Sequence, residues 1–128
     1  MAKRLSKALR GKRRWVGVEC SDQFSSRSSL EKYLRSVLAS IQVSEQIRVM
    51  DFHANGSDVS RKACEQLELA EQRGFAILEV PHTAYEEVRR CFASEESFNL
   101  HGILSRTSSG KIRLVRERLN IPRPIRKR

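Results

Sequence analysis

The apolar residues of this chain alternate between the spacing of strands and the spacing of helices, in an order that few folds can accommodate. The clearest segment follows Ser28, where Glu31 completes a capping-box pattern. Apolar side chains then recur at i, i+3, i+4, i+7, i+8 and i+11, on Leu30, Tyr33, Leu34, Val37, Leu38 and Ile41. This periodicity predicts an amphipathic helix that packs its apolar face on a core.

The remaining segments are predicted from the same two spacings and from turn residues. Strands are expected at 14–20, with Val16, Val18 and Cys20 on one face, at 47–52, at the almost wholly apolar 75–80, and at 98–106. Helices are expected at about 58–73, from a Thr83–Glu86 capping box to Phe92, and from a Ser108 or Ser109 cap to a stop before Pro122.

The order is strand, helix, strand, extra helix, strand, helix, strand, helix. Strand–helix–strand repeated twice packs two helices on one face of a four-stranded antiparallel sheet, so we predict an α+β, ferredoxin-like sandwich of the RNA-recognition-motif kind. One domain is expected over residues 14–120, between a basic extension (1–13) and a basic tail (121–128). The helix at 58–73 would be an insertion, and the second sheet face would be free for a partner.

Positive charge is concentrated at the two ends of the chain. Residues 1–14 contain seven Lys or Arg and no acid, and residues 106–128 contain nine against Glu117 alone. The 91 residues between them hold nine bases and fourteen acids. Because Lys and Arg that neutralise phosphates are the main source of sequence-independent affinity for nucleic acid, this layout favours a polyanion partner. Neither basic run has an aromatic or leucine-rich face that would insert into lipid, so no membrane partner is expected.

No stretch approaches the roughly 18 apolar residues of a membrane span. Residues 1–14 also lack the apolar core of a signal peptide, so we expect a cytoplasmic protein. Cys20, Cys64 and Cys91 form no CxxC pair and lie within apolar patterns. They are therefore interpreted as reduced, structural thiols.

The three histidines, His53, His82 and His101, fall at a strand end, before a helix and inside a strand. Their spacing does not predict convergence with a carboxylate, so no catalytic residue, metal or cofactor is expected. An acylphosphatase, an enzyme on this same fold, would need a glycine-rich loop after the first strand. Residues 21–26 contain no glycine, and that activity is set aside.

Residues 73–80 look like the third strand of an RNA-recognition motif, in which alternate aromatics stack on bases. Phe75 fits that pattern, whereas Ile77 and Val80 stand where aromatics are wanted. Core packing explains Phe75 at least as well.

Residues 106–113 combine small residues, a glycine and cations at an expected helix start. Exposed backbone N–H groups, the helix dipole and Lys111 would together suit a phosphate. The same residues could equally form an ordinary serine-capped helix, and both interpretations stay open.

Taken together, these segments resemble the protein component 2 family of archaeal ribonuclease P, which has eukaryotic relatives. The similarity lies in the basic leader Leu5 to Arg14 that runs into Trp15 and a strand, in Glu87-Val88-Arg89 within a helix, and in Arg106-Thr107 followed by Ser109-Gly110-Lys111-Ile112-Arg113. Lys111 stands where the family's motif has threonine.

The resemblance implies a non-catalytic, RNA-binding subunit of a ribonucleoprotein whose RNA removes the 5′ leader of precursor tRNA. The implied partners are the ribonuclease P RNA, precursor tRNA and protein component 3, which is barrel-like. The residues expected to contact RNA are Lys3, Arg4, Arg10, Lys12, Arg13, Arg14, Arg106, Ser109, Gly110, Lys111, Arg113, Arg116 and Arg118.

Two other functions are compatible with the sequence. A free-standing RNA-recognition module would read single-stranded bases on its sheet, and Phe75→Ala would abolish its binding. A small nuclease would cut RNA without any partner.

Overall fold

The computed structural model describes residues 13–43 and 46–124. The elements in chain order are β1 (Arg13–Cys20), α2 (Arg27–Ser40), β2 (Arg48–His53), α3 (Asp58–Gln66), β3 (Gly74–Pro81), the 3-10 turn η1 (His82–Ala84), α4 (Tyr85–Cys91), α5 (Glu95–His101), β4 (Ile103–Ser109) and α6 (Ile112–Leu119).

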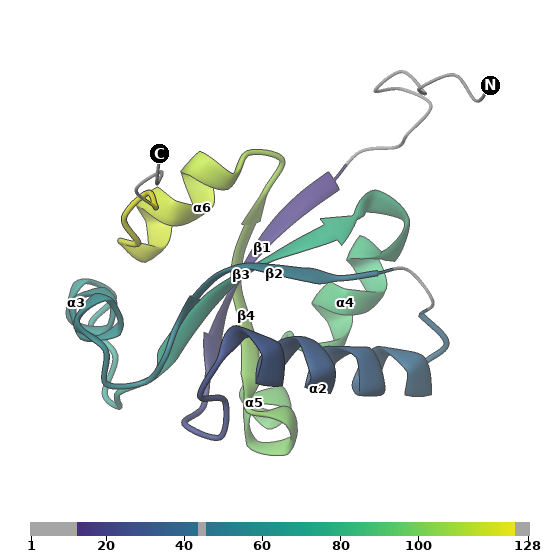
Figure 1. The fold of residues 1–128 in the computed structure, drawn as a ribbon, viewed down its shortest axis with the longest axis horizontal. Coiled ribbons are helices and arrows are strands. Elements are labelled where there is room, and N and C mark those ends of the chain that lie inside the picture. The colour runs from purple at the N-terminus through teal and green to yellow at the C-terminus, as the bar shows by residue number, and fades with distance from the viewer. Residues whose placement is uncertain (1–12, 44–45, 125–128) are drawn as a thin grey trace.

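The four strands form one antiparallel sheet in the order β2-β3-β1-β4 (Figure 1). β1 is central and pairs with β3 on one side and with β4 on the other. β1-α2-β2 and β3-α4-α5-β4 are the two strand–helix–strand units, so the predicted α+β fold with a ferredoxin-like strand order is confirmed.

The first core lies between the sheet and the helices α2 and α4. Alternate strand residues point into it, including Val16 and Val18 of β1. The predicted apolar stripe of α2 supplies Leu30, Leu34 and Leu38, each at most 2% exposed. The predicted helix is therefore confirmed, although the position of its cap is not.

The cap of α2 is Ser26, two residues before the predicted one. Its hydroxyl accepts the Ser29 backbone N–H, and the Ser29 hydroxyl accepts the Ser26 N–H, both at 3.2 Å. Glu31 does not cap the helix. Its carboxylate accepts the Val49 backbone N–H at 2.9 Å, which satisfies a donor on the edge strand β2.

A second core covers the opposite sheet face, which the sequence had led us to expect open. α3 contributes Ala63 and Cys64, and α6 contributes Val115 and Leu119, packed on Phe75 and Ile77 of β3 together with Ile121. Gly17 makes the close approach of α6 possible. A Cβ atom there would lie 2.6 Å from Leu119 Cδ1 and 2.8 Å from Val115 Cγ1. The expectation of a free face is therefore wrong.

The fourth strand begins later than predicted. Residues 98–101 belong to the helix α5, which starts after Ser94 with Glu95 and Glu96 in its first turn. Acidic side chains there complement the helix dipole. The helix ends at Gly102, whose φ of 72° suits a glycine C-cap. β4 therefore spans Ile103–Ser109.

Three other helix limits differ from the predicted ones. α3 ends at Gln66 rather than near Arg73, and Glu68 after it has a positive φ of 55°. α4 begins at Tyr85, after the turn that contains Thr83, with Ala84 at the N-cap position. Ser108 and Ser109 extend β4, and Lys111 occupies the N-cap position of α6.

Candidate nucleic-acid interface

Antiparallel pairing brings the start of β1 and the end of β4 to the same end of the sheet (Figure 1). Trp15 pairs with Ser109 on one side and with Glu79 on the other, and Glu79 pairs in turn with Arg48. Arg13 and Arg14, at the start of β1, therefore lie at the same sheet end as Ser109, which is more than ninety residues later in sequence and is followed by Gly110 and Lys111. We call Arg13, Arg14, Arg48 and Lys111 the cationic end.

Glu79 holds two of these cations. The Arg13 guanidinium lies 2.9 Å and that of Arg48 4.0 Å from its carboxylate oxygens. The Glu79 side chain is only 11% exposed, whereas the Arg13 and Arg48 side chains are 62% and 61% exposed. One largely buried negative charge thus orients two exposed positive ones, and the group presents net positive charge to solvent.

Arg14 and the end of β4 are both fixed by Tyr85. The Arg14 guanidinium lies over the Tyr85 ring, 5.2 Å from its centroid, in a cation–π contact. The Tyr85 hydroxyl is 2.5 Å from the Ser108 hydroxyl. Tyr85 is only 8% exposed, so it links α4, β1 and β4 from beneath the exposed residues of the cationic end.

The junction of β4 and α6 contains the predicted phosphate-binding segment. The Ser109 hydroxyl accepts the Lys111 backbone N–H at 3.1 Å, and α6 has no side-chain cap. The segment therefore does not form the serine-capped helix that was one of its two interpretations. Gly110 and Lys111 are exposed, so this junction is accessible to an anion.

Two of the predicted RNA-contacting arginines are held by buried acids. Arg106 is 3.0 Å from Glu19, which is fully buried and also accepts Arg73 at 2.7 Å. Arg116 makes two hydrogen bonds to the buried Asp51, at 2.8 and 3.1 Å. Because these guanidiniums neutralise carboxylates that have lost water, their role is to hold β4 and α6 on the sheet.

The other predicted residues of α6 are exposed. Arg118 donates to the Thr107 hydroxyl and to the Ser108 carbonyl, both at 3.0 Å, and so braces the end of β4. Arg113 lies 3.7 Å from Glu117 in an exposed i,i+4 pair. Such a pair contributes only about 0.3–0.5 kcal/mol, so Arg113 can readily turn to another anion. Lys3, Arg4, Arg10 and Lys12 lie outside the described residues.

A groove of about 910 Å³ runs between α3 and α6. Its lining residues come from both helices and from the segment after α6: Asp58, Val59, Lys62, Ile112, Arg113, Arg116, Glu117, Asn120, Ile121, Pro122 and Arg123. Sequence reasoning missed Lys62, Arg123 and Arg48 as candidate contacts. The packing of α3 beside α6 and the strand order reveal them, because Lys62 and Arg48 lie outside the two basic ends of the chain and Arg123 lies in the tail after α6.

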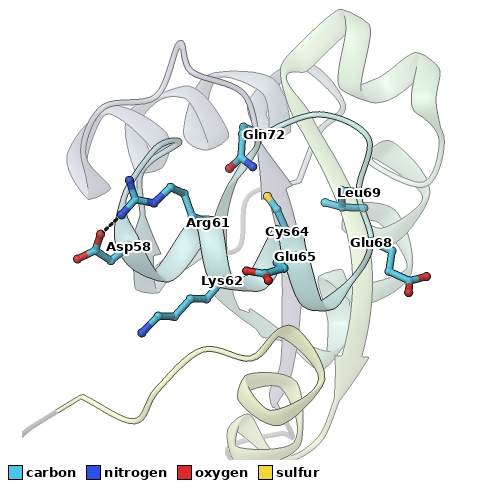
Figure 2. A pocket seen from close by; sticks show the side chains of 8 residues that line it. All are labelled: Asp58, Arg61, Lys62, Cys64, Glu65, Glu68, Leu69 and Gln72. Atoms are coloured by element: carbon cyan, nitrogen blue, oxygen red, sulfur yellow. Dashed lines mark hydrogen bonds and ion pairs between the residues drawn. The ribbon is translucent and has the colours of Figure 1, made fainter.

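A second hollow, of about 640 Å³, lies along α3 on the side of the loop that leads to β3 (Figure 2). It mixes Arg61 and Lys62 with the acids Asp58, Glu65 and Glu68, so it has no preference for a polyanion. Cys64 in its wall accepts the Arg73 backbone N–H at 3.3 Å and lies 3.4 Å from the Arg73 carbonyl. That thiol is therefore a structural contact between α3 and β3.

The histidines, cysteines and acids of the described residues are the side chains that could ligate a metal ion. Within residues 13–43 and 46–124 no three His, Cys, Asp or Glu side chains form a group that could hold a metal ion. The His101 ring accepts or donates a 2.9 Å hydrogen bond with the Tyr33 hydroxyl. Burial lowers the pKa of His53, and the nearby Asp51 opposes that shift. Burial raises the pKa of both Cys20 and Cys91, which keeps these thiols protonated.

Comparison with known proteins gives no family assignment: no family model, curated protein or solved structure matches this chain. Among the helices of the described residues, none combines the length and the apolar character needed to cross a membrane.

Proposed function

We propose that this protein is an RNA-binding, non-catalytic subunit of ribonuclease P, which supports the catalytic RNA in removing the 5′ leader of precursor tRNA. The observation that supports the proposal is the cationic end, where the strand register puts Arg13 and Arg14 at the same end of the sheet as the β4–α6 junction with Lys111. The resemblance of the leader and of the 106–113 segment to component 2 supplies the identity of the ribonucleoprotein.

The proposed mechanism is electrostatic. RNA strands that approach each other in a folded catalytic RNA repel through their phosphates, and a rigid group of cations between them lowers that repulsion. Arg13 is hydrogen-bonded to Glu79 and Arg14 lies over the Tyr85 ring, so both are positioned before RNA binds, and Arg48 lies 4.0 Å from the same Glu79 carboxylate. Arginine is suited to this task because its guanidinium pairs with phosphate oxygens through two hydrogen bonds. Component 3 would be the protein partner in this assembly.

The alternative, a free-standing module that stacks bases on its sheet, has less support. Phe75 is fully buried beneath the second core, and α3 and α6 cover the face on which a base would have to stack. A base could reach Phe75 only after both helices moved away, at the cost of that core.

Cleavage of precursor tRNA distinguishes the proposals. We expect the purified protein alone to cut nothing, and to raise cleavage by a ribonuclease P RNA at low Mg²⁺. Replacing Arg14 and Lys111 by Ala should reduce that stimulation, whereas replacing the exposed α2 cations Lys32 and Arg35 should leave it unchanged. Cleavage by the protein without RNA, or no stimulation of any ribonuclease P RNA, would contradict the proposed function.

A further inference from the structure

The helix α3 lies between β2 and β3, where a ferredoxin-like sheet needs only a short connection. It contributes Ala63 and Cys64 to the second core and also forms one wall of the groove against α6. Its exposed face in that groove carries Lys62, and Figure 2 shows this side chain extending from α3 toward the side where α6 and the following segment lie.

Most charges that line the groove already have partners. Arg116 is bonded to Asp51, Arg113 lies near Glu117, and Asp58 pairs with Arg61. Lys62 and Arg123 are exposed and make no ion pair with any described residue. They come from different walls, one from α3 and the other from the segment after α6. The groove therefore offers two uncommitted positive charges to an anion that lies along it.

The rest of the lining is aliphatic. Val59 from α3, Ile112 from α6 and Pro122 from the following segment line the same groove, and Ile121 lies behind them in the second core. A ligand that fits must present negative charges to the walls and apolar surface to the floor. The volume of the groove, about 910 Å³, lies within the range of roughly 300–1,000 Å³ that is common for ligand sites.

Single-stranded RNA has this combination, because its phosphates are exposed and its unpaired bases can turn an apolar face to a protein. Duplex RNA does not, since its bases are stacked inside the helix. The helix α6, which forms one wall of the groove, starts at the cationic end. Lys111 lies at the start of that helix, Arg113 borders the groove, and Arg123 follows its end.

We propose that the groove between α3 and α6 binds a single-stranded segment of RNA, with phosphates at Lys62 and Arg123 and bases against Val59, Ile112 and Pro122. This proposal rests on the proposed RNA-binding function and assigns the inserted helix α3 a part in it. It places one unpaired strand on a path from the cationic end to the segment that follows α6.

Titration of the full chain with a fluorescent ten-nucleotide oligouridylate at several salt concentrations tests the proposal. The double variant K62A/R123A removes two phosphate contacts, so the slope of log affinity against log salt should fall by about 1.4. The matched control K32A/R35A removes two exposed cations from α2, on the opposite side of the sheet, and should leave the slope unchanged. An abasic oligomer with the same phosphates should bind the wild-type protein several-fold more weakly than oligouridylate.

Equal slopes for wild type and K62A/R123A would overturn the proposal. So would equal affinity for the abasic oligomer, which would leave no role for the aliphatic floor. If a polyglutamate peptide displaced oligouridylate at equal charge concentration, the groove would instead suit an acidic protein segment. Oligouridylate binding that depends on Lys62 and Arg123, without stimulation of ribonuclease P RNA, would contradict the proposed function and leave the groove site standing.

Discussion

Gly17 is the position where a single added methyl group tests the packing of α6 on the sheet. In Gly17→Ala the new Cβ would meet Leu119 Cδ1 at 2.6 Å, Val115 Cγ1 at 2.8 Å and Thr107 Cγ2 at 3.1 Å. The first two distances are too short for carbon atoms in contact, so α6 must shift or its side chains must leave their preferred rotamers. Overpacking of this kind costs about 1–3 kcal/mol.

A second effect acts in the opposite direction. Alanine restricts the unfolded chain more than glycine does, which stabilises the folded state by about 0.4–1 kcal/mol. From the midpoints of these two ranges, the net loss of unfolding free energy should be about 1.3 kcal/mol. For a chain of this length that corresponds to a Tm lower by about 5 °C.

Urea unfolding and thermal melting of Gly17→Ala measure this loss directly. Gly110→Ala is the matched control, because a Cβ there would have no atom within 4 Å, and its unfolding free energy should change by less than about 0.5 kcal/mol. A Tm for Gly17→Ala equal to or above that of the wild type would refute the close packing of α6 on β1.

Three further predictions concern the cores and the buried charges. Arg116→Ala leaves the buried Asp51 without its cation and should cost about 3–5 kcal/mol in urea unfolding, whereas a surface change such as Arg89→Ala should stay within about 0.5 kcal/mol. Phe75→Ala should cost about 3–5 kcal/mol, yet the fraction that remains folded should bind RNA with an unchanged salt slope. Burial raises the pKa of the Cys20 thiol above its ordinary value of 9.0. Below about pH 9 the thiol is protonated in both the folded and the unfolded state, so the unfolding free energy does not depend on its titration. Above about pH 9 the unfolded state loses the proton first, so the unfolding free energy should fall by about 1.4 kcal/mol per pH unit. Comparing the wild type with Cys20→Ala in urea at pH 8 and pH 10 checks this, and an equal pH dependence in the two proteins would contradict it.

The sequence was sufficient for the strand order because the strongest patterns lie in the elements that set it. The stripe on α2 and the apolar run of β3 each had one structural interpretation. It was insufficient for α5, where Phe98 and His101 resemble strand residues. The acids of the first turn favour a helix there and Gly102, with its positive φ, ends it, and the contact of Phe98 with Arg73 is visible only in three dimensions.

The candidate interface was predictable as a charge pattern but not as a set of contacts. Local sequence cannot tell Arg116, which neutralises a buried Asp51, from Arg113, which faces solvent, because the partner of Arg116 lies on β2 whereas Arg113 pairs within α6. For the same reason the covered sheet face was missed. The packing of α6 depends on Gly17, more than ninety residues away from that helix in sequence.

The central claim is that the cationic end binds RNA through phosphates, and the salt dependence of binding to a ribonuclease P RNA tests it most directly. The triple variant R13A/R14A/K111A should reduce the slope of log affinity against log salt by about 3, since each lost phosphate contact removes about 1. The control K32A/R35A/R89A, which removes three exposed cations from α2 and α4, should leave the slope at its wild-type value. Equal slopes for the wild type and for the R13A/R14A/K111A variant, both folded, would contradict the claim.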